Sequence, residues 1–236
     1  MANKIKTIGI IAGSGPEAGI DLWSKILSHT QNQLGDAFRG DLDAPRVVII
    51  SEPQLGLSMD LRANQADTWA ALEKTVRQLA PQVDYFAIAC NTLNWFAPQI
   101  DTLLTTIKDG GTFVSFVDVL TETLVNAGQT RFGLMAAAPV LALDDHSAYT
   151  PLAQNFDVET PSDHQAMQDL IYDVKRYGSD TPALSQRMAD FASHMDSDTV
   201  VLACTELPLI SQKITGKAVI DVTNAVAQKL ARLALE

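Results

Sequence analysis

The two cysteines of the chain fall at the same point of the same local pattern. Cys90 ends the apolar run in DYFAIACNT and Cys204 ends the one in DTVVLACTEL, and an aspartate opens each run six residues before the thiol. A thiolate can act as a base and a thiol as an acid. Either cysteine taken alone is more simply a small buried hydrophobic residue, but repetition of the whole pattern indicates a shared chemical role.

Two thiols on opposite sides of a substrate suit one kind of reaction. One thiolate can remove a proton from a carbon atom while the other thiol donates a proton to the opposite face. Inversion of a stereocentre needs this arrangement, because a single base tends to return the proton to the face that it left. The paired cysteines therefore predict a racemisation in which Cys90 and Cys204 are the acid and the base.

The elements that must position these thiols alternate along the chain. Apolar runs of strand length are separated by amphipathic segments of helix length. Nearly continuous apolar strands between helices predict an α/β fold in which mostly parallel sheets are flanked by helices. The expected strands are 7–13, 46–51, 84–90, 113–117, 131–137, 199–204 and 218–221, and the expected helices are 16–34, 62–80, 94–107 and 223–234.

The two halves of the chain also resemble each other. TIGIIAGSGP at 7–16 and TRFGLMAAAP at 130–139 share an opening Thr, a mid-strand Gly and a closing Pro. The two mid-strand glycines are 124 residues apart and the two cysteines are 114 apart, both near half of the 236 residues. These spacings indicate an internal duplication.

The duplication predicts two pseudo-symmetric domains. We assign residues 1–112 plus 222–236 to the first domain and residues 113–221 to the second. Ligands of open α/β sheets bind at the carboxyl ends of the strands. Both thiols lie at such strand ends, so we expect them to face each other across a cleft between the domains.

Polar residues follow each thiol directly. Asn91-Thr92 and Thr205-Glu206 are of the types that cap helix N-termini. Free N–H groups and the helix dipole at such an end favour an anion, and they lower a thiol pKa from about 8.5. The same setting suits a substrate carboxylate. The sequence leaves two interpretations of Glu206 open: it favours the helix N-terminus electrostatically, or it orients Thr205 or the thiol.

Composition and charge limit the possible partners. The net charge is −11 and no Lys/Arg cluster is present, which argues against nucleic acid and anionic membranes. No apolar run reaches the roughly 18–20 residues of a membrane span. The N-terminal stretch lacks the pattern of a signal peptide, so we expect a cytoplasmic protein with reduced cysteines. The expected partner is a small amino acid or carboxylic acid.

Other motifs give no reason to expect a cofactor. Gly13-Ser14-Gly15 lacks the Gly-Lys-Ser/Thr ending of a P-loop, and no Ser lies in a Gly-x-Ser-x-Gly elbow. The adjacent Asp144, Asp145 and His146 cannot all reach one ion, so we expect a solvated helix cap there rather than metal ligands. These motifs therefore indicate no P-loop, no serine-hydrolase elbow and no metal site.

Three segments resemble the signature segments of the aspartate/glutamate racemase family. They are IGIIAGSGPEAGIDLW, DYFAIACNT and VVLACTELPLI, which correspond to a Gly-rich loop, a Cys-Asn-Thr and a Cys-Thr-Glu. The resemblance implies two pseudo-symmetric α/β domains with the active site between them. It also implies racemisation without pyridoxal phosphate or metal, and a homodimer.

The resemblance also implies roles for individual residues. Cys90 and Cys204 would be the two acid/base thiols. Lys175 falls where the family offers a cation to the distal carboxylate of the substrate, and Arg176 competes with it because the register is ambiguous by one residue. The residues that would line the cleft or hold the α-carboxylate and ammonium are Gly13, Ser14, Gly15, Asn91, Thr92 and Thr205.

The chain departs from the family at two loops. After the second strand the family carries Pro-Gln-Ile-Pro-Asp-Arg, whose Arg grips the distal carboxylate. Here EPQLGLSMDLR keeps Gln54 and has Ser58 where that Arg should fall, with Arg62 as an alternative after a short insertion. The family's Ala-Thr-x-Gly-Thr is AAAPV at 136–140, which has lost its hydroxyls. Both departures touch the substrate pocket.

The sequence thus predicts a cofactor-independent amino-acid racemase of the aspartate/glutamate type, an isomerase, and leaves its substrate open. Within enzymes, the alternatives are a hydantoin racemase and an isomerase of a maleate-like diacid that works by covalent attack. Outside enzymes, the alternative is a small-molecule binding protein without turnover. Exchange of an α-proton with solvent separates these possibilities.

Overall fold

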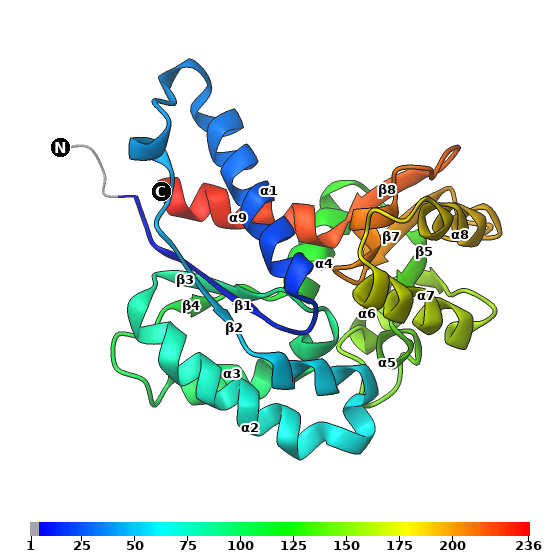
Figure 1. The fold of residues 1–236 in the computed structure, drawn as a ribbon, viewed down its shortest axis with the longest axis horizontal. Helices are drawn as coiled ribbons and strands as arrows, with labels where there is room; N and C mark the ends of the chain where they lie inside the picture. The colour runs from blue at the N-terminus through cyan, green and yellow to red at the C-terminus, as the bar shows by residue number, and fades with distance from the viewer. Residues whose placement is uncertain (1–4) are drawn as a thin grey trace.

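Two parallel four-stranded sheets form the framework of the molecule (Figure 1). The structure is a computed structural model that describes residues 5–236, so the N-terminal stretch used in the signal-peptide prediction begins outside the described residues. The strands are β1 (Ile8–Ala12), β2 (Val47–Ser51), β3 (Tyr85–Ile88), β4 (Thr112–Phe113), β5 (Arg131–Ala136), β6 (Asp157–Glu159), β7 (Thr199–Ala203) and β8 (Ala218–Asp221).

The two sheets share one strand order. The first sheet runs β2-β1-β3-β4 and the second runs β6-β5-β7-β8, with every pair parallel. In each sheet the first strand lies between the second and the third. The strands that precede the two cysteines, β3 and β7, therefore hold equivalent positions. The predicted α/β fold with two pseudo-symmetric halves is confirmed.

Helices pack on the sheets and bury the apolar faces of the strands. Every residue of β1 and of β7 is buried, as expected for strands covered on both sides. Within residues 5–236, no helix has the length and apolar character needed to cross a bilayer.

The helices are α1 (Pro16–Leu34), α2 (Leu61–Leu79), α3 (Ala97–Leu104), α4 (Phe116–Asn126), α5 (Ala138–Leu141), α6 (Thr150–Asn155), α7 (His164–Tyr177), α8 (Pro182–Ser193) and α9 (Val222–Leu235). Short 3₁₀ segments are η1 (Gly35–Ala37), η2 (Asp41–Asp43), η3 (Pro53–Asp60), η4 (Ala80–Gln82), η5 (Thr92–Phe96) and η6 (Leu207–Ile210).

The last helix, α9, joins the two halves. It packs against α1 and α4, and it also contacts β3 of the first sheet and β7 of the second (Figure 1). Lys25 of α1 forms an ion pair with Asp221, the N-cap residue of α9, at 2.7 Å. We keep the domain division into residues 1–112 plus 222–236 and residues 113–221 as a proposal.

The structure corrects three predicted elements. The predicted strand 113–117 is wrong beyond Phe113, because Ser115 accepts a hydrogen bond from the backbone N of Asp118 at 3.2 Å and α4 begins at Phe116. The predicted helix near 94–107 is divided between η5 and α3. The short edge strand β6 was not predicted, since DVE is three residues long and carries two charges.

Candidate active site

The carboxyl ends of β3 and β7 meet where the two halves of the molecule touch. Cys90 follows β3 and Cys204 follows β7, and the two residues are 8% and 7% exposed. Thr205 Oγ1 donates to the carbonyl oxygen of Ala89 at 3.3 Å, which joins the neighbour of one cysteine to the neighbour of the other. The structure therefore brings the two thiols to one buried site.

Serine hydroxyls surround the Cys90 thiol. Cys90 Sγ donates to Ser14 Oγ at 3.4 Å and lies 3.8 Å from Ser58 Oγ. The two hydroxyls are 2.8 Å apart and both are buried. A hydroxyl can turn its hydrogen toward either neighbour, so this pair can also donate to a Cys90 thiolate.

Glycine backbone geometry places Ser14 beside the thiol. Gly13 and Gly15 have φ of 115° and 125°, in the region that residues with a Cβ rarely adopt. A Cβ on Gly13 would lie 2.2 Å from the carbonyl oxygen of Glu52, and one on Gly15 would lie 1.9 Å from Glu206 Oε1. The loop after β1 thus needs glycine on both sides of Ser14, and it reaches residues of both halves.

A carboxylate and an ammonium group surround the Cys204 thiol. Cys204 Sγ donates to Glu206 Oε2 at 3.0 Å, and Thr205 Oγ1 lies 3.2 Å from the same oxygen. Lys175 Nζ from α7 lies 3.2 Å from Glu206 Oε1 and donates to the carbonyl oxygen of Ser14 at 2.6 Å. Glu206 is buried, so Lys175 bridges a buried carboxylate of the second half and the Gly-rich loop of the first.

This setting determines the protonation of Cys204 and Lys175. Burial raises the pKa of the Cys204 thiol well above its ordinary value and the Glu206 carboxylate adds to the rise, while Lys175 and the backbone N–H of Glu206 oppose it only in part. Burial works to lower the pKa of Lys175, but Glu206 and the two thiols outweigh it, so that pKa is raised. At neutral pH Cys204 is therefore a thiol and Lys175 is charged.

The expected effect of helix N-termini on the thiols is wrong at Cys204. The segment after this residue, η6, is a short 3₁₀ turn rather than a long helix, and Glu206 lies between the thiol and that turn. Burial and the carboxylate together outweigh the helix terminus. The capping roles expected for Asn91 and Glu206 are also absent, because neither side chain bonds to the backbone of the segment that follows it.

A tyrosine that the sequence analysis missed completes the site. The buried Tyr149 donates its hydroxyl hydrogen bond to Asn91 Oδ1. Burial raises its pKa, and the nearby Cys204 and Cys90 raise it further. Among the described residues, Asn91 Nδ2 has no hydrogen-bond partner although it is buried. Tyr149 therefore fixes the Asn91 amide with a free N–H₂ group in the buried interior.

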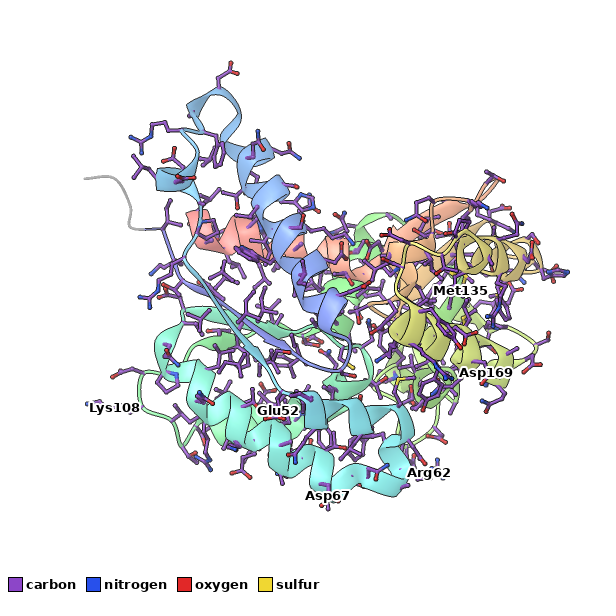
Figure 2. The ribbon with its side chains drawn as sticks, viewed as in Figure 1. Glu52, Arg62, Asp67, Lys108, Met135 and Asp169 are labelled. Carbon is purple, nitrogen blue, oxygen red and sulfur yellow. The ribbon has the colours of Figure 1, made fainter. Side chains whose placement is uncertain are left out.

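Three predicted candidates lie away from the thiols. Gln54 is exposed, and its backbone N donates to Glu52 Oε1 at 3.1 Å. The Arg62 side chain is 65% exposed and pairs with Asp144 at 2.6 Å. Figure 2 shows Arg62 at the end of α2 that is nearest the second half of the molecule. Arg176 is exposed and stacks over the Tyr177 ring at 5.3 Å. Of the two neighbouring cations on α7, the structure therefore brings Lys175 to the thiols and turns Arg176 away.

A cleft of about 360 Å³ opens next to this buried site, between the start of α2 and the helices α5 and α7. Gln168 crosses it: its Nε2 donates to the carbonyl oxygen of Met59 at 3.2 Å, and its Oε1 accepts from the backbone N of Ala138 at 2.8 Å. Met59 adjoins Ser58 in the chain, but neither thiol lines the cleft. A hollow of about 460 Å³ between β6 and α8 contains none of the predicted site residues.

The site offers no arrangement of metal ligands. In the part of the chain that the structure describes, no group of three or more His, Cys, Asp or Glu side chains could hold an ion. The helix cap expected at Asp144 is wrong, because this stretch is a turn: Asp144 Oδ1 accepts from the backbone N of His146 at 2.9 Å, and the next helix, α6, begins at Thr150 with Tyr149 as its N-cap. The chemistry available at the site is that of two thiols, hydroxyls, an amide, a carboxylate and an ammonium group.

Comparison with known protein families identifies the family of this chain. Residues 11–230 match the family described as Asp/Glu/Hydantoin racemase, and the chain belongs to this family. The predicted family is confirmed, and so is the predicted enzyme class, since racemases are isomerases. No curated protein matches the chain.

Solved structures share the fold. The aspartate racemase of Picrophilus torridus superposes with a TM-score of 0.76 at 23% identity, over 97% of this chain and 94% of that one. An aspartate racemase homologue from Pyrococcus horikoshii OT3 gives 0.71 at 20%, over 98% and 100%. The glutamate racemase of Francisella tularensis in complex with D-glutamate gives 0.65 at 14%, over 98% and 81%. At these identities the similarity shows the fold.

Proposed function

We propose that this protein is a cofactor-independent amino-acid racemase that inverts the α-carbon of its substrate with Cys90 and Cys204. The observation that carries the proposal is the meeting of two equivalent strand ends, each with a buried thiol, at one site. Lys175 and Tyr149 interact electrostatically with both thiols, which supports their closeness. Family membership supports the reaction class.

The proposed reaction moves two protons. In one direction the Cys90 thiolate takes the α-proton, so that the C–H bond breaks and an S–H bond forms. The Cys204 thiol gives its proton to the opposite face of the carbon and becomes the thiolate. The reverse direction exchanges these roles. The two thiols supply both the acid and the base, so the proposed reaction uses no cofactor.

Polar groups next to the thiols would hold the substrate. Asn91 Nδ2 is a buried donor without a partner in the described residues, which makes it a suitable donor to the α-carboxylate. Thr92 and Thr205, in the chain segments that follow the two thiols, are also buried. These groups are proposed to orient the α-carbon between the two sulfur atoms.

A hydantoin racemase is the second candidate. The matching family includes hydantoin racemases by its description. A hydantoin ring presents amide groups rather than carboxylates, and the buried site holds an amide and several hydroxyls. A diacid isomerase with covalent attack by a thiol and a binding protein without turnover remain alternatives for the same test.

The test follows the α-proton of candidate substrates by NMR in D₂O under reducing conditions, with both enantiomers of each amino acid and a hydantoin. Loss of the α-proton signal together with build-up of the other enantiomer is the expected result. Conversion of maleate without α-proton exchange would replace racemisation by covalent isomerisation. Tight binding of a substrate without exchange would replace it by a binding role.

We also propose that the protein is a cytoplasmic homodimer. The dimer follows from the resemblance, and the location follows from the two free thiols, which a reducing compartment would keep active. Light scattering of the purified protein measures the first: a mass of two chains is expected, and a mass of one chain would contradict it.

A further inference from the structure

Opposite charges balance inside the buried site. Among the described residues that contact the thiols or their partners there, Lys175 carries the positive charge and Glu206 the negative one, 3.2 Å apart. The other polar groups are neutral, and they belong to Ser14, Ser58, Asn91, Thr92, Tyr149 and Thr205. The formal charge of the site is zero when both thiols are protonated, and it is −1 when Cys90 is the thiolate that the proposed reaction uses.

The ammonium group of Lys175 already has partners within the protein. Lys175 Nζ donates to the carbonyl oxygen of Ser14 at 2.6 Å and pairs with Glu206 Oε1. Both side chains are largely removed from solvent. A second carboxylate brought beside this pair would find its counter-charge shared with Glu206, and burying a carboxylate without a full counter-charge is strongly unfavourable.

The nearest alternative cation is turned outward. Arg62 is 65% exposed and its guanidinium is bound to Asp144 at 2.6 Å, at the edge of the cleft. The position that contacts Cys90 from the same segment is Ser58, which is fully buried and neutral. The described residues thus offer a distal carboxylate no unpaired positive charge at this site.

Two buried polar atoms show what the site can accept. Within residues 5–236, Asn91 Nδ2 has no acceptor, and Glu206 Oε1 has only its ion pair with Lys175. A ligand that satisfies both brings one acceptor group and one donor group. The α-carboxylate and the α-ammonium of an amino acid are such groups, and together they are neutral.

We propose that the substrate is a zwitterionic amino acid with an uncharged side chain. The Lys175–Glu206 pair is balanced and the neutral Ser58 stands where the family has a second cation, so the site excludes aspartate and glutamate. This proposal rests on the racemase function above and names its substrate class. The α-ammonium of the substrate lies toward Glu206, and its side chain carries no charge that the site would have to neutralise.

Two pairs of amino acids of equal shape test the proposal. Asparagine and aspartate differ in one charge, as do glutamine and glutamate, and alanine and serine extend the neutral set. The wild-type protein is assayed in D₂O, and the pair whose amide exchanges its α-proton faster is compared. We expect kcat/KM for exchange of that amide to be at least roughly tenfold higher than for the corresponding acid. A preference for either acid over its amide would overturn the proposal and leave the racemase function standing.

The Glu206→Gln variant sharpens this test. It makes the charge of the site more positive by one unit, so affinity measured by calorimetry should shift toward the acid of each pair by roughly tenfold. Glu73→Gln is the matched control, because Glu73 pairs with Arg77 on the surface of α2 and should leave the preference unchanged. An unchanged preference in Glu206→Gln would overturn the proposal.

Calorimetry also separates the two proposals when exchange is absent. Binding of neutral amino acids in preference to their acids, without exchange, would remove the racemase function and support the substrate class. Failure to bind any neutral amino acid would overturn the substrate class.

Discussion

The two thiols occupy equivalent positions in two equivalent sheets, yet their surroundings differ. Cys90 and Cys204 are almost equally buried, at 8% and 7% exposure. Cys90 lies between the hydroxyls of Ser14 and Ser58, whereas Cys204 donates to the carboxylate of Glu206. Duplication of the fold thus supplies the geometry of a paired site, and the loops that differ between the halves give each thiol different polar neighbours.

The difference affects how the reaction starts at Cys204. Burial and Glu206 raise the pKa of this thiol, so Cys204 is suited to begin as the acid. The two enantiomers of a free amino acid have equal free energy, so kcat/KM must be equal in both directions. The asymmetry therefore shows in kcat and in KM separately.

Removal of either thiol tests whether both are needed. In Cys90→Ser and in Cys204→Ser, the rate of racemisation should fall by roughly a thousandfold or more, because one face of the α-carbon loses its proton carrier. Chiral chromatography of the product measures the rate. Unchanged melting temperatures establish that the variants fold, and a wild-type rate in either folded variant would refute a paired role.

Alkylation by iodoacetamide tests the difference between the thiols. Because their burial is matched, at pH 8 Cys90 should react faster than Cys204, whose thiolate is opposed by Glu206. Glu206→Gln should raise the rate at Cys204 by roughly tenfold, because it removes the carboxylate that disfavours the thiolate. Peptide mass spectrometry measures both rates, with Glu73→Gln as the control. Faster alkylation of Cys204 in the wild type would contradict the assignment.

The Tyr149–Asn91 contact predicts a smaller effect on substrate binding. Tyr149→Phe removes the hydroxyl that holds the Asn91 amide, a hydrogen bond with a net value of about 1 kcal/mol. KM should rise roughly fivefold, with a smaller change in kcat, because the donor to the α-carboxylate loses its orientation. Tyr177→Phe, on the exposed end of α7, is the control. A fall in kcat alone would assign Tyr149 to proton transfer instead.

The smallest predicted effect is a loss of folding stability at alkaline pH. The folded-state pKa of Cys204 is raised, so its contribution to stability is complete below its unfolded pKa of about 8.5 and is lost as pH rises toward the folded pKa. Between pH 7 and pH 9 this loss is on the order of 1 kcal/mol in the free energy of unfolding. Urea denaturation of the wild type and Cys204→Ala should show a steeper decline in the wild type. Parallel pH dependences would contradict the raised pKa.

The strands of both sheets follow from the sequence because buried parallel strands need continuous apolar runs. β1 and β7 are fully buried and lie inside the predicted ranges. The prediction failed where a local signal was overlooked, at Ser115, whose side chain caps α4 within an apolar stretch. It also failed at β6, where a neighbouring strand rather than the short segment itself stabilises the pairing.

Part of the site could also be predicted from the sequence, because two local patterns in the chain point to it. Repetition drew attention to both cysteines, the position after Cys204 drew it to Glu206, and the resemblance drew it to Ser14 and Lys175. The contact of Tyr149 with Asn91 spans 58 residues and both halves of the fold, and no spacing in the chain signals it. The exposed position of Gln54 likewise depends on how η3 packs, which its sequence alone does not determine.

Stereospecific exchange in the single-thiol variants tests the central claim most directly. A variant with one thiol can still remove the α-proton from the face that this thiol contacts and return deuterium to the same face. With the amino acid that the wild type inverts, NMR in D₂O should therefore show exchange of one enantiomer in Cys90→Ala, exchange of the other in Cys204→Ala, and inversion in neither. Exchange of the same enantiomer by both variants, or inversion by either, would contradict thiols on opposite faces of the substrate.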